Sequence, residues 1–271
     1  MKIKCVWEHN GDDTLLYAVD QVGAFARGEN LDAAMGKMEQ EISSYFAWSG
    51  ACDFEKAGEI SVSGVESVFE TKQSSENGQT PGTKQELERD PLFTLEIVQE
   101  KESDLQIADA DSDVIFDAEK EELTLEEYQQ LKELALKSAQ DFLELYESVP
   151  DKNKSCLPER KTFYGAIPRT AQEMYEHTKN VNAYYFGEMD IAADNEGNIY
   201  ECRKRGFELL EQREDFLKNP VIEGSYDELW SVRKMLRRFI WHDRIHGKAM
   251  YRMAVRTFGR DAVKNPFRFV R

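Results

Sequence analysis

The stretch SYDELWSVRKMLRRFIWHDRIHGKAMYRMAVRTFG, residues 225–259, decides how the second half of the chain folds. Its core-facing positions recur every three or four residues, which is the spacing of one face of an amphipathic helix. These positions are Val232, Leu236, Phe239, His242, His246, Met250 and Met253. Ser225 and Glu228 match a capping box, so we expect one long helix that begins near Ser225.

Three shorter helical patterns precede this one. They are LTLEEYQQLKELALKSAQDFLELYESV (residues 123–149), TAQEMYEHTKNVNAYYFGEM (170–189) and IYECRKRGFELLEQREDFLKN (199–219). Capping boxes at Thr124 and Thr170 open the first two, and Gly206 weakens the third. The sequence therefore predicts an all-α four-helix bundle over residues 123–271, with a C-terminal tail that docks through Phe267 and Phe269.

In residues 1–110, several strand-like runs of hydrophobic residues flank one helical run, which predicts a small α+β domain. Strand-like runs are KIKCVWEH (2–9), TLLYAVDQVGAFARG (14–28), EISVSGVESVFET (59–71) and LFTLEIVQE (92–100). The helical run ENLDAAMGKMEQEISSYFAWSG has Asn30 as its N-cap and Gly50 as its stop. We expect a mobile loop near 72–90, and an acidic connector over 111–122 with a short strand at 114–116.

The charge of the chain argues against a nucleic-acid partner. The net charge is −17, yet residues 233–271 alone carry +10, so the rest of the chain repels a polyanion. We expect the basic segment to pair with the acidic helices. No apolar run approaches about 18 residues, no signal sequence is evident, and the four cysteines are scattered. These features predict a cytoplasmic protein without a membrane segment.

Three of the four histidines fall on core-facing stripes of predicted helices. His242 and His246 are one helical turn apart, and His177 lies on the stripe of the second helix. Three imidazoles can hold a divalent metal such as zinc, nickel, iron or copper, with an open position typical of a catalytic site. The alternative is three buried, hydrogen-bonded core histidines. A zincin protease is not expected, because Asp243 replaces the general-base Glu of HExxH.

The segments MYEHTKNVNAYYFGEM and LRRFIWHDRIHGKAMYRMA carry a resemblance over residues 123–259. They resemble the DinB-like (YfiT-like) superfamily of metal-binding four-helix bundles. That resemblance implies a divalent metal held by His177, His242 and His246. It also implies a homodimer and one of several activities: thiol transfer, maleylpyruvate-type isomerisation, or no known reaction.

The segment GAFARGENLDAAMGKMEQEISSYFAWSG, within residues 1–50, resembles HicB-like domains. The resemblance implies a small α+β fold that binds a protein partner. HicB-like domains include antitoxins, but the acidic charge and the lack of an evident DNA-binding element argue against an antitoxin activity here.

Two functions follow as expectations. In the first, a small-molecule thiol is activated at the metal and attacks an electrophile, or a water is activated for hydrolysis. Arg238 and Tyr185 are candidates for binding the substrate; Arg233, Arg237 and Arg244 either bind an anion or form ion pairs. Tyr184 and Trp241 either line a pocket or belong to the core. In the second, the chain is a non-catalytic metal-binding or protein-interaction module.

Overall fold

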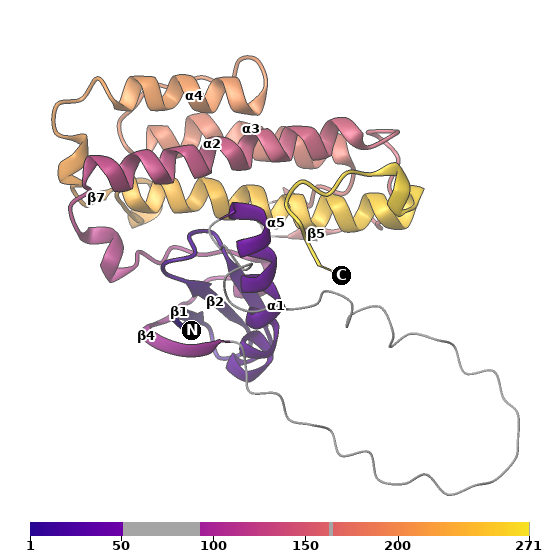
Figure 1. Cartoon of the computed structure of the whole chain (residues 1–271), viewed down its shortest axis with the longest axis horizontal. Coiled ribbons are helices and arrows are strands. Elements are labelled where there is room, and N and C mark those ends of the chain that lie inside the picture. The colour runs from indigo at the N-terminus through magenta and orange to yellow at the C-terminus, as the bar shows by residue number, and fades with distance from the viewer. Residues whose placement is uncertain (51–92, 163–164, 271) are drawn as a thin grey trace, which may run out of the picture.

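The computed structural model describes residues 1–50, 93–162 and 165–270. An N-terminal sheet with one helix is followed by a helical region, so the described chain is a mixture of α and β structure (Figure 1). The predicted strand at 59–71 and the predicted loop at 72–90 lie outside the described residues.

Within the described residues, the N-terminal sheet has four strands in the order β3-β2-β1-β4. They are β1 (Lys2–His9), β2 (Thr14–Ala18), β3 (Phe25–Gly28) and β4 (Thr94–Glu102). β1 and β3 are antiparallel to β2, whereas β4 is parallel to β1. The single strand predicted over 14–28 is wrong, because the chain turns at Gly23 (φ +92°) and returns as β3. The turn is closed by the N–H of Ala24, which donates to the carbonyl of Gln21 at 2.8 Å.

Both faces of the sheet are covered, and β2 is buried along its whole length. One face packs on α1 (Leu31–Ser49), through residues such as Ile3 and Leu16. The other face packs on the segment around Ile107 and on Trp241 of the last helix. Asn30 caps α1 and Gly50 ends it with φ +70°, as the sequence predicted.

Residues 111–122 lie against the last helix. The predicted strand at 114–116 is wrong, because backbone carbonyls here accept hydrogen bonds from side chains of that helix. Lys234 Nζ donates to the carbonyl of Asp113 (2.7 Å), and Arg237 Nη2 donates to that of Val114 (2.8 Å). A 3-10 turn at Asp117–Lys120 follows.

Four helices form the C-terminal region. They are α2 (Leu125–Ser148), α3 (Ala171–Gly187), α4 (Ile199–Leu210) and α5 (Val232–Phe258). α5 packs against α2 and α3, and α4 packs against the same two helices. The capping boxes at Thr124 and Thr170 are confirmed. α4 ends earlier than predicted, with a 3-10 turn at Phe216–Lys218 beyond it, and Gly206 lets the ring of Phe186 contact its backbone.

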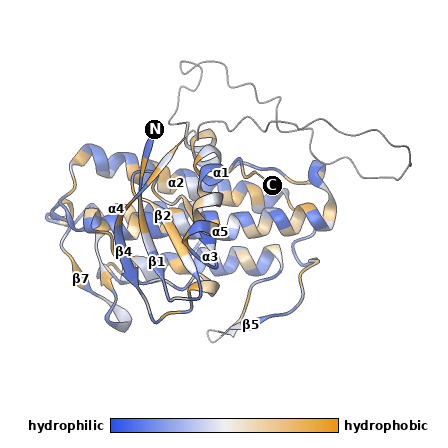
Figure 2. Ribbon diagram, turned by 90° about the horizontal axis from the view of Figure 1, so that it is seen from below, coloured by the Kyte–Doolittle hydropathy of each residue, from blue (hydrophilic) through white to orange (hydrophobic). Residues whose placement is uncertain are grey.

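The predicted start of α5 at Ser225 is wrong. Tyr226 has φ +62° and cannot continue a helix. The chain instead forms a hairpin of β7 (Ile222–Glu223) and β8 (Leu229–Trp230), and the Ser231 hydroxyl then caps α5 by accepting from the N–H of Lys234 at 3.1 Å. Figure 2 shows this hairpin at one end of the helices and the strand β5 (Lys161–Thr162), which pairs with β6 (Gly165–Ala166), near the other.

The basic C-terminal segment forms ion pairs with acidic groups of the chain, as the sequence predicted. The pairs are Arg233–Glu127, Lys234–Glu228, Arg237–Glu119, Arg244–Glu41, Lys248–Glu41 and Lys264–Glu144. Phe267 and Phe269 are buried, so the tail docks as predicted. Among the described helices, none is both long and apolar enough to cross a membrane.

Candidate metal centre

The three histidines lie together between α3 and α5. His177 comes from α3, while His242 and His246 are one turn apart on α5. Each offers a nitrogen within 4.8 Å of the others. The ring centroids of His242 and His246 are 4.4 Å apart, and that of His177 is 4.6 Å from His246 and 5.1 Å from His242. The set predicted from helical stripes therefore converges in space.

Each imidazole is held in its neutral form. His177 keeps one exposed side, but the protein around the rest of its ring desolvates it in part and lowers its pKa below the ordinary value of 6.5. Burial and then the neighbouring histidines lower the pKa of His242 well below 6.5. Burial and His177 together lower the pKa of His246 to about 3. A neutral imidazole keeps the lone pair with which it binds a cation.

The surroundings of His242 favour a ligand over an ordinary core histidine. Its side chain is 7% exposed, and its buried Nδ1 has no hydrogen-bond partner among the described residues. Such an unpaired group costs about 1–3 kcal/mol. A tetrahedral ion with metal–nitrogen bonds of about 2.0–2.1 Å needs nitrogens roughly 3.4 Å apart, so small side-chain rotations close the set. His177 is exposed, which leaves one side accessible. These residues fit a divalent cation.

Of the predicted substrate-binding residues, Tyr185 lies next to His242, and Arg238 lies against Tyr185. The ring of Tyr185 meets that of His242 edge-on, with centroids 6.0 Å apart. The guanidinium of Arg238 lies 5.5 Å from the Tyr185 ring and donates to the carbonyl of Ser112 at 3.0 Å. Tyr185 is 2% exposed, so its ring is a buried neighbour of His242. A role for either residue in binding substrate stays a prediction.

The remaining candidates serve the architecture. Asp243 is fully buried and forms a two-pronged ion pair with Arg203 of α4, one bond of which measures 3.1 Å, so it is not part of the histidine set. Trp241 packs on the sheet, with its ring centroid 6.0 Å from that of Phe25. Arg233, Arg237 and Arg244 form ion pairs with acidic side chains of the chain, which was one of the two roles expected for them.

A cavity of about 540 Å³ has His246 in its wall. It is enclosed by residues of β3, α1 and α5 and by the segments around Ala108 and around Arg160. Met174, one turn before His177 on α3, also lines it. The charged residues of this cavity come from separate segments that carry no common motif, so no sequence pattern predicts their meeting.

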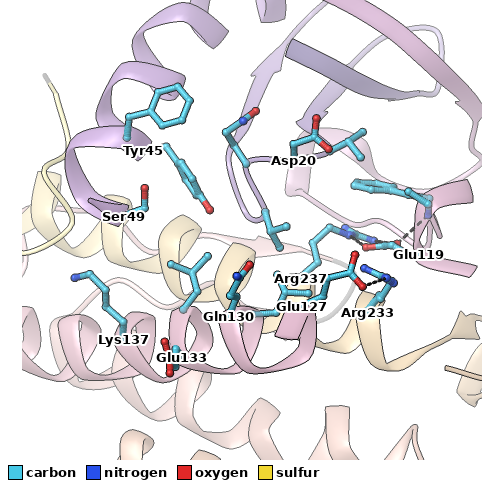
Figure 3. Close-up of a pocket in the computed structure, with 18 residues that line it drawn as sticks. Asp20, Tyr45, Ser49, Glu119, Glu127, Gln130, Glu133, Lys137, Arg233 and Arg237 are labelled. Carbon is cyan, nitrogen blue, oxygen red and sulfur yellow. Dashed lines mark hydrogen bonds and ion pairs between the residues drawn. The ribbon is translucent and has the colours of Figure 1, made fainter. Parts of the chain in front are cut away.

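A second cavity, of about 770 Å³, lies between α1, the turn after β2, and α2 (Figure 3). None of the three histidines lines it. Two of its acidic side chains are paired, Glu119 with Arg237 and Glu127 with Arg233, as the dashed lines in Figure 3 indicate. Of these two cavities, the smaller one therefore includes one residue of the candidate metal centre, His246.

No protein-family model matches this chain, and neither a curated protein nor a solved structure matches it.

Proposed function

We propose that this chain is a metal-dependent thiol transferase with a DinB-like helical region. In this proposal His177, His242 and His246 hold a divalent metal such as zinc, nickel or iron. The N-terminal part is proposed to be HicB-like in fold. The order of the helices, with one histidine on the second and a pair on the last, supports the first assignment.

The convergence of three neutral imidazoles from two helices carries the proposal. Neutral nitrogens that lie within 4.8 Å of one another match the donor set of a catalytic zinc-type site. A divalent cation with three protein ligands supplies an open position at which the pKa of a thiol falls toward neutrality.

The chain's own residues orient this donor set. Tyr185 packs against His242 and limits the rotation of its ring. The ion pair between Asp243 and Arg203 fixes the rotation of α5 against α4, so that the neighbouring His242 faces α3. The transfer forms a sulfur–carbon bond to an electrophile such as a chlorinated aromatic and releases chloride, while the thiol proton passes to solvent.

Metal content tests the ligand assignment. The full chain, purified without a histidine tag and loaded with Zn²⁺, is expected to retain about one equivalent after dialysis. The double variant His242→Ala, His246→Ala is expected to retain none. His9→Ala is the matched control, because His9 stacks on Trp7 in the sheet, away from the site. Equal metal in the wild type and the double variant would refute the assignment.

Turnover separates the enzyme from the non-catalytic module. Consumption of a chlorinated aromatic that requires both metal and an added thiol is the expected result. A chain that binds one metal but leaves the electrophile unchanged across a panel of neutral, anionic and cationic thiols would contradict thiol transfer. That outcome would favour a metal-binding or protein-interaction module.

A further inference from the structure

The cavity beside His246 is cationic, although the chain as a whole is strongly acidic. The net charge of the chain is −17. Five cationic side chains nevertheless line this cavity, against two acidic ones. The cations are Arg27, Lys37, Arg160, Lys248 and Arg252, and the acids are Glu41 and Asp109. A local concentration of positive charge on an acidic protein attracts small anions to one place.

Three of these cations, Arg27, Arg160 and Arg252, are exposed residues that line the same cavity. Within the described ranges, the side chains of Arg160 and Arg252 form no ion pair. Partial desolvation lowers the pKa of Arg27; Asp109 and Asp13 raise it, and the charges of Arg160 and Arg252 lower it further. Arg160 and Arg252 therefore lie close enough to Arg27 for their like charges to act on it. Like charges held together in this way are stabilised by a bound anion.

The acidic groups do not cancel this charge. Glu41 is 5% exposed and is already bound by Arg244, at 2.6 Å, and by Lys248. Asp109 is the remaining carboxylate of the lining. Asp109 acts on Arg27, so Arg160 and Arg252 are the arginines of the lining left for a ligand that brings its own negative charge.

The cavity also connects the cations to the metal centre. His246 is part of its wall, and apolar side chains of Leu157, Met174 and Ile245 line it as well. A volume of about 540 Å³ suits a small organic molecule. An anionic ligand held by the arginines can therefore extend its other end toward the histidines.

We infer that this cavity binds the anionic groups of the thiol substrate, so that the preferred thiol carries two or more carboxylates. The inference rests on the proposed function and names its substrate class. It also gives the N-terminal part a share in the site, because Arg27 comes from β3 and Lys37 from α1.

Binding of mercaptosuccinate, a thiol with two carboxylates, tests the inference. Calorimetry on the full chain, with and without Co²⁺, gives the dissociation constant; thiolate absorption on Co²⁺ reports contact with the metal without turnover. The double variant Arg160→Gln, Arg252→Gln is expected to weaken mercaptosuccinate binding by about tenfold or more, the effect of losing two charge-assisted contacts. Binding of uncharged 2-mercaptoethanol is expected to change by less than about twofold. Arg256→Gln, an exposed arginine one turn along α5, is the matched control.

Each outcome of this experiment is decisive. Equal effects of the double variant on both thiols, or none on mercaptosuccinate, would overturn the inference. Displacement of mercaptosuccinate by inorganic phosphate at lower concentration than by succinate would overturn the carboxylate assignment in favour of a phosphate-bearing thiol. Arginine-dependent binding in a chain that takes up no Co²⁺ would support the anion site while refuting the proposed metal chemistry.

Discussion

Glu41→Gln is expected to destabilise the contact between α1 and α5. Glu41 is 5% exposed, and its carboxylate binds Arg244, which is fully buried, and Lys248, whose side chain is 20% exposed. Breaking a buried ion pair by removing one partner costs about 3–5 kcal/mol, because the other charge stays uncompensated. Lys248 can turn to solvent, so nearly all of the cost comes from Arg244.

The aromatic rings around Arg244 reduce that cost. Its guanidinium lies 5.2 Å from the Tyr45 ring, 4.8 Å from Trp48 and 5.4 Å from Phe269. Desolvated cation–π contacts of this kind are worth about 1–2 kcal/mol in total. The expected loss in the free energy of unfolding is therefore about 1–4 kcal/mol.

Urea denaturation followed by tryptophan fluorescence measures this loss, since Trp48 lies at the contact. The matched control is Glu208→Gln, which removes an exposed pair with Lys204 and is expected to cost less than about 0.5 kcal/mol. Adding Arg244→Met to Glu41→Gln is expected to restore most of the stability. A loss in Glu41→Gln no larger than in Glu208→Gln would refute the reasoning.

The other predictions concern pH, packing and metal. Burial alone would raise the pKa of Glu41, but the charges of Arg244 and Lys248 outweigh it and hold this pKa below its ordinary value of 4.5. The stability that Glu41 contributes is therefore present above pH 4.5 and is lost as the pH falls through the lower folded value. The free energy of unfolding should accordingly fall less steeply with acid in Glu41→Gln than in the wild type. Gly206→Ala should lower the melting temperature, because overlap with Phe186 costs about 1–3 kcal/mol against a helix-propensity gain of about 1 kcal/mol, whereas a rise would contradict the packing. Zn²⁺ at 100 times its dissociation constant should add about 2.7 kcal/mol to the free energy of unfolding, and equal stabilisation of His242→Ala, His246→Ala would argue against the site.

The helices could be predicted from sequence where periodicity and caps agree. Thr124 and Thr170 start α2 and α3 as expected, because the capping interactions are local. Ser225 has the same local pattern but fails, since the hairpin of β7 and β8 takes up the residues that would have formed the first turn. The division of 14–28 into β2 and β3 does not follow from the apolar pattern, because Gly23, which makes the turn, lies within a nearly continuous apolar run.

The histidines and the cationic cavity differ in what local sequence can reveal. His242 and His246 share a helix, and His177 lies on the side of α3 that meets them, so periodicity predicts the group, although His177 itself is exposed rather than buried in the core. Arg27 and Arg160 lie far apart in the chain and are exposed, like most arginines. Their meeting depends on how the sheet packs against the helices, and no pattern within one segment encodes that.

The hydrogen bonds between α5 and the segment before α2 limit where the chain can be divided. Lys234 and Arg237, almost fully buried, use the backbone oxygens of Asp113 and Val114 as acceptors. A fragment that starts at residue 123 would leave both cations without those acceptors and would aggregate or be proteolysed. A fragment that starts at residue 111 would retain them, but it would leave buried Arg244 without Glu41 and uncover Trp241 where it packs on the sheet, so the helical region does not separate cleanly from the N-terminal sheet.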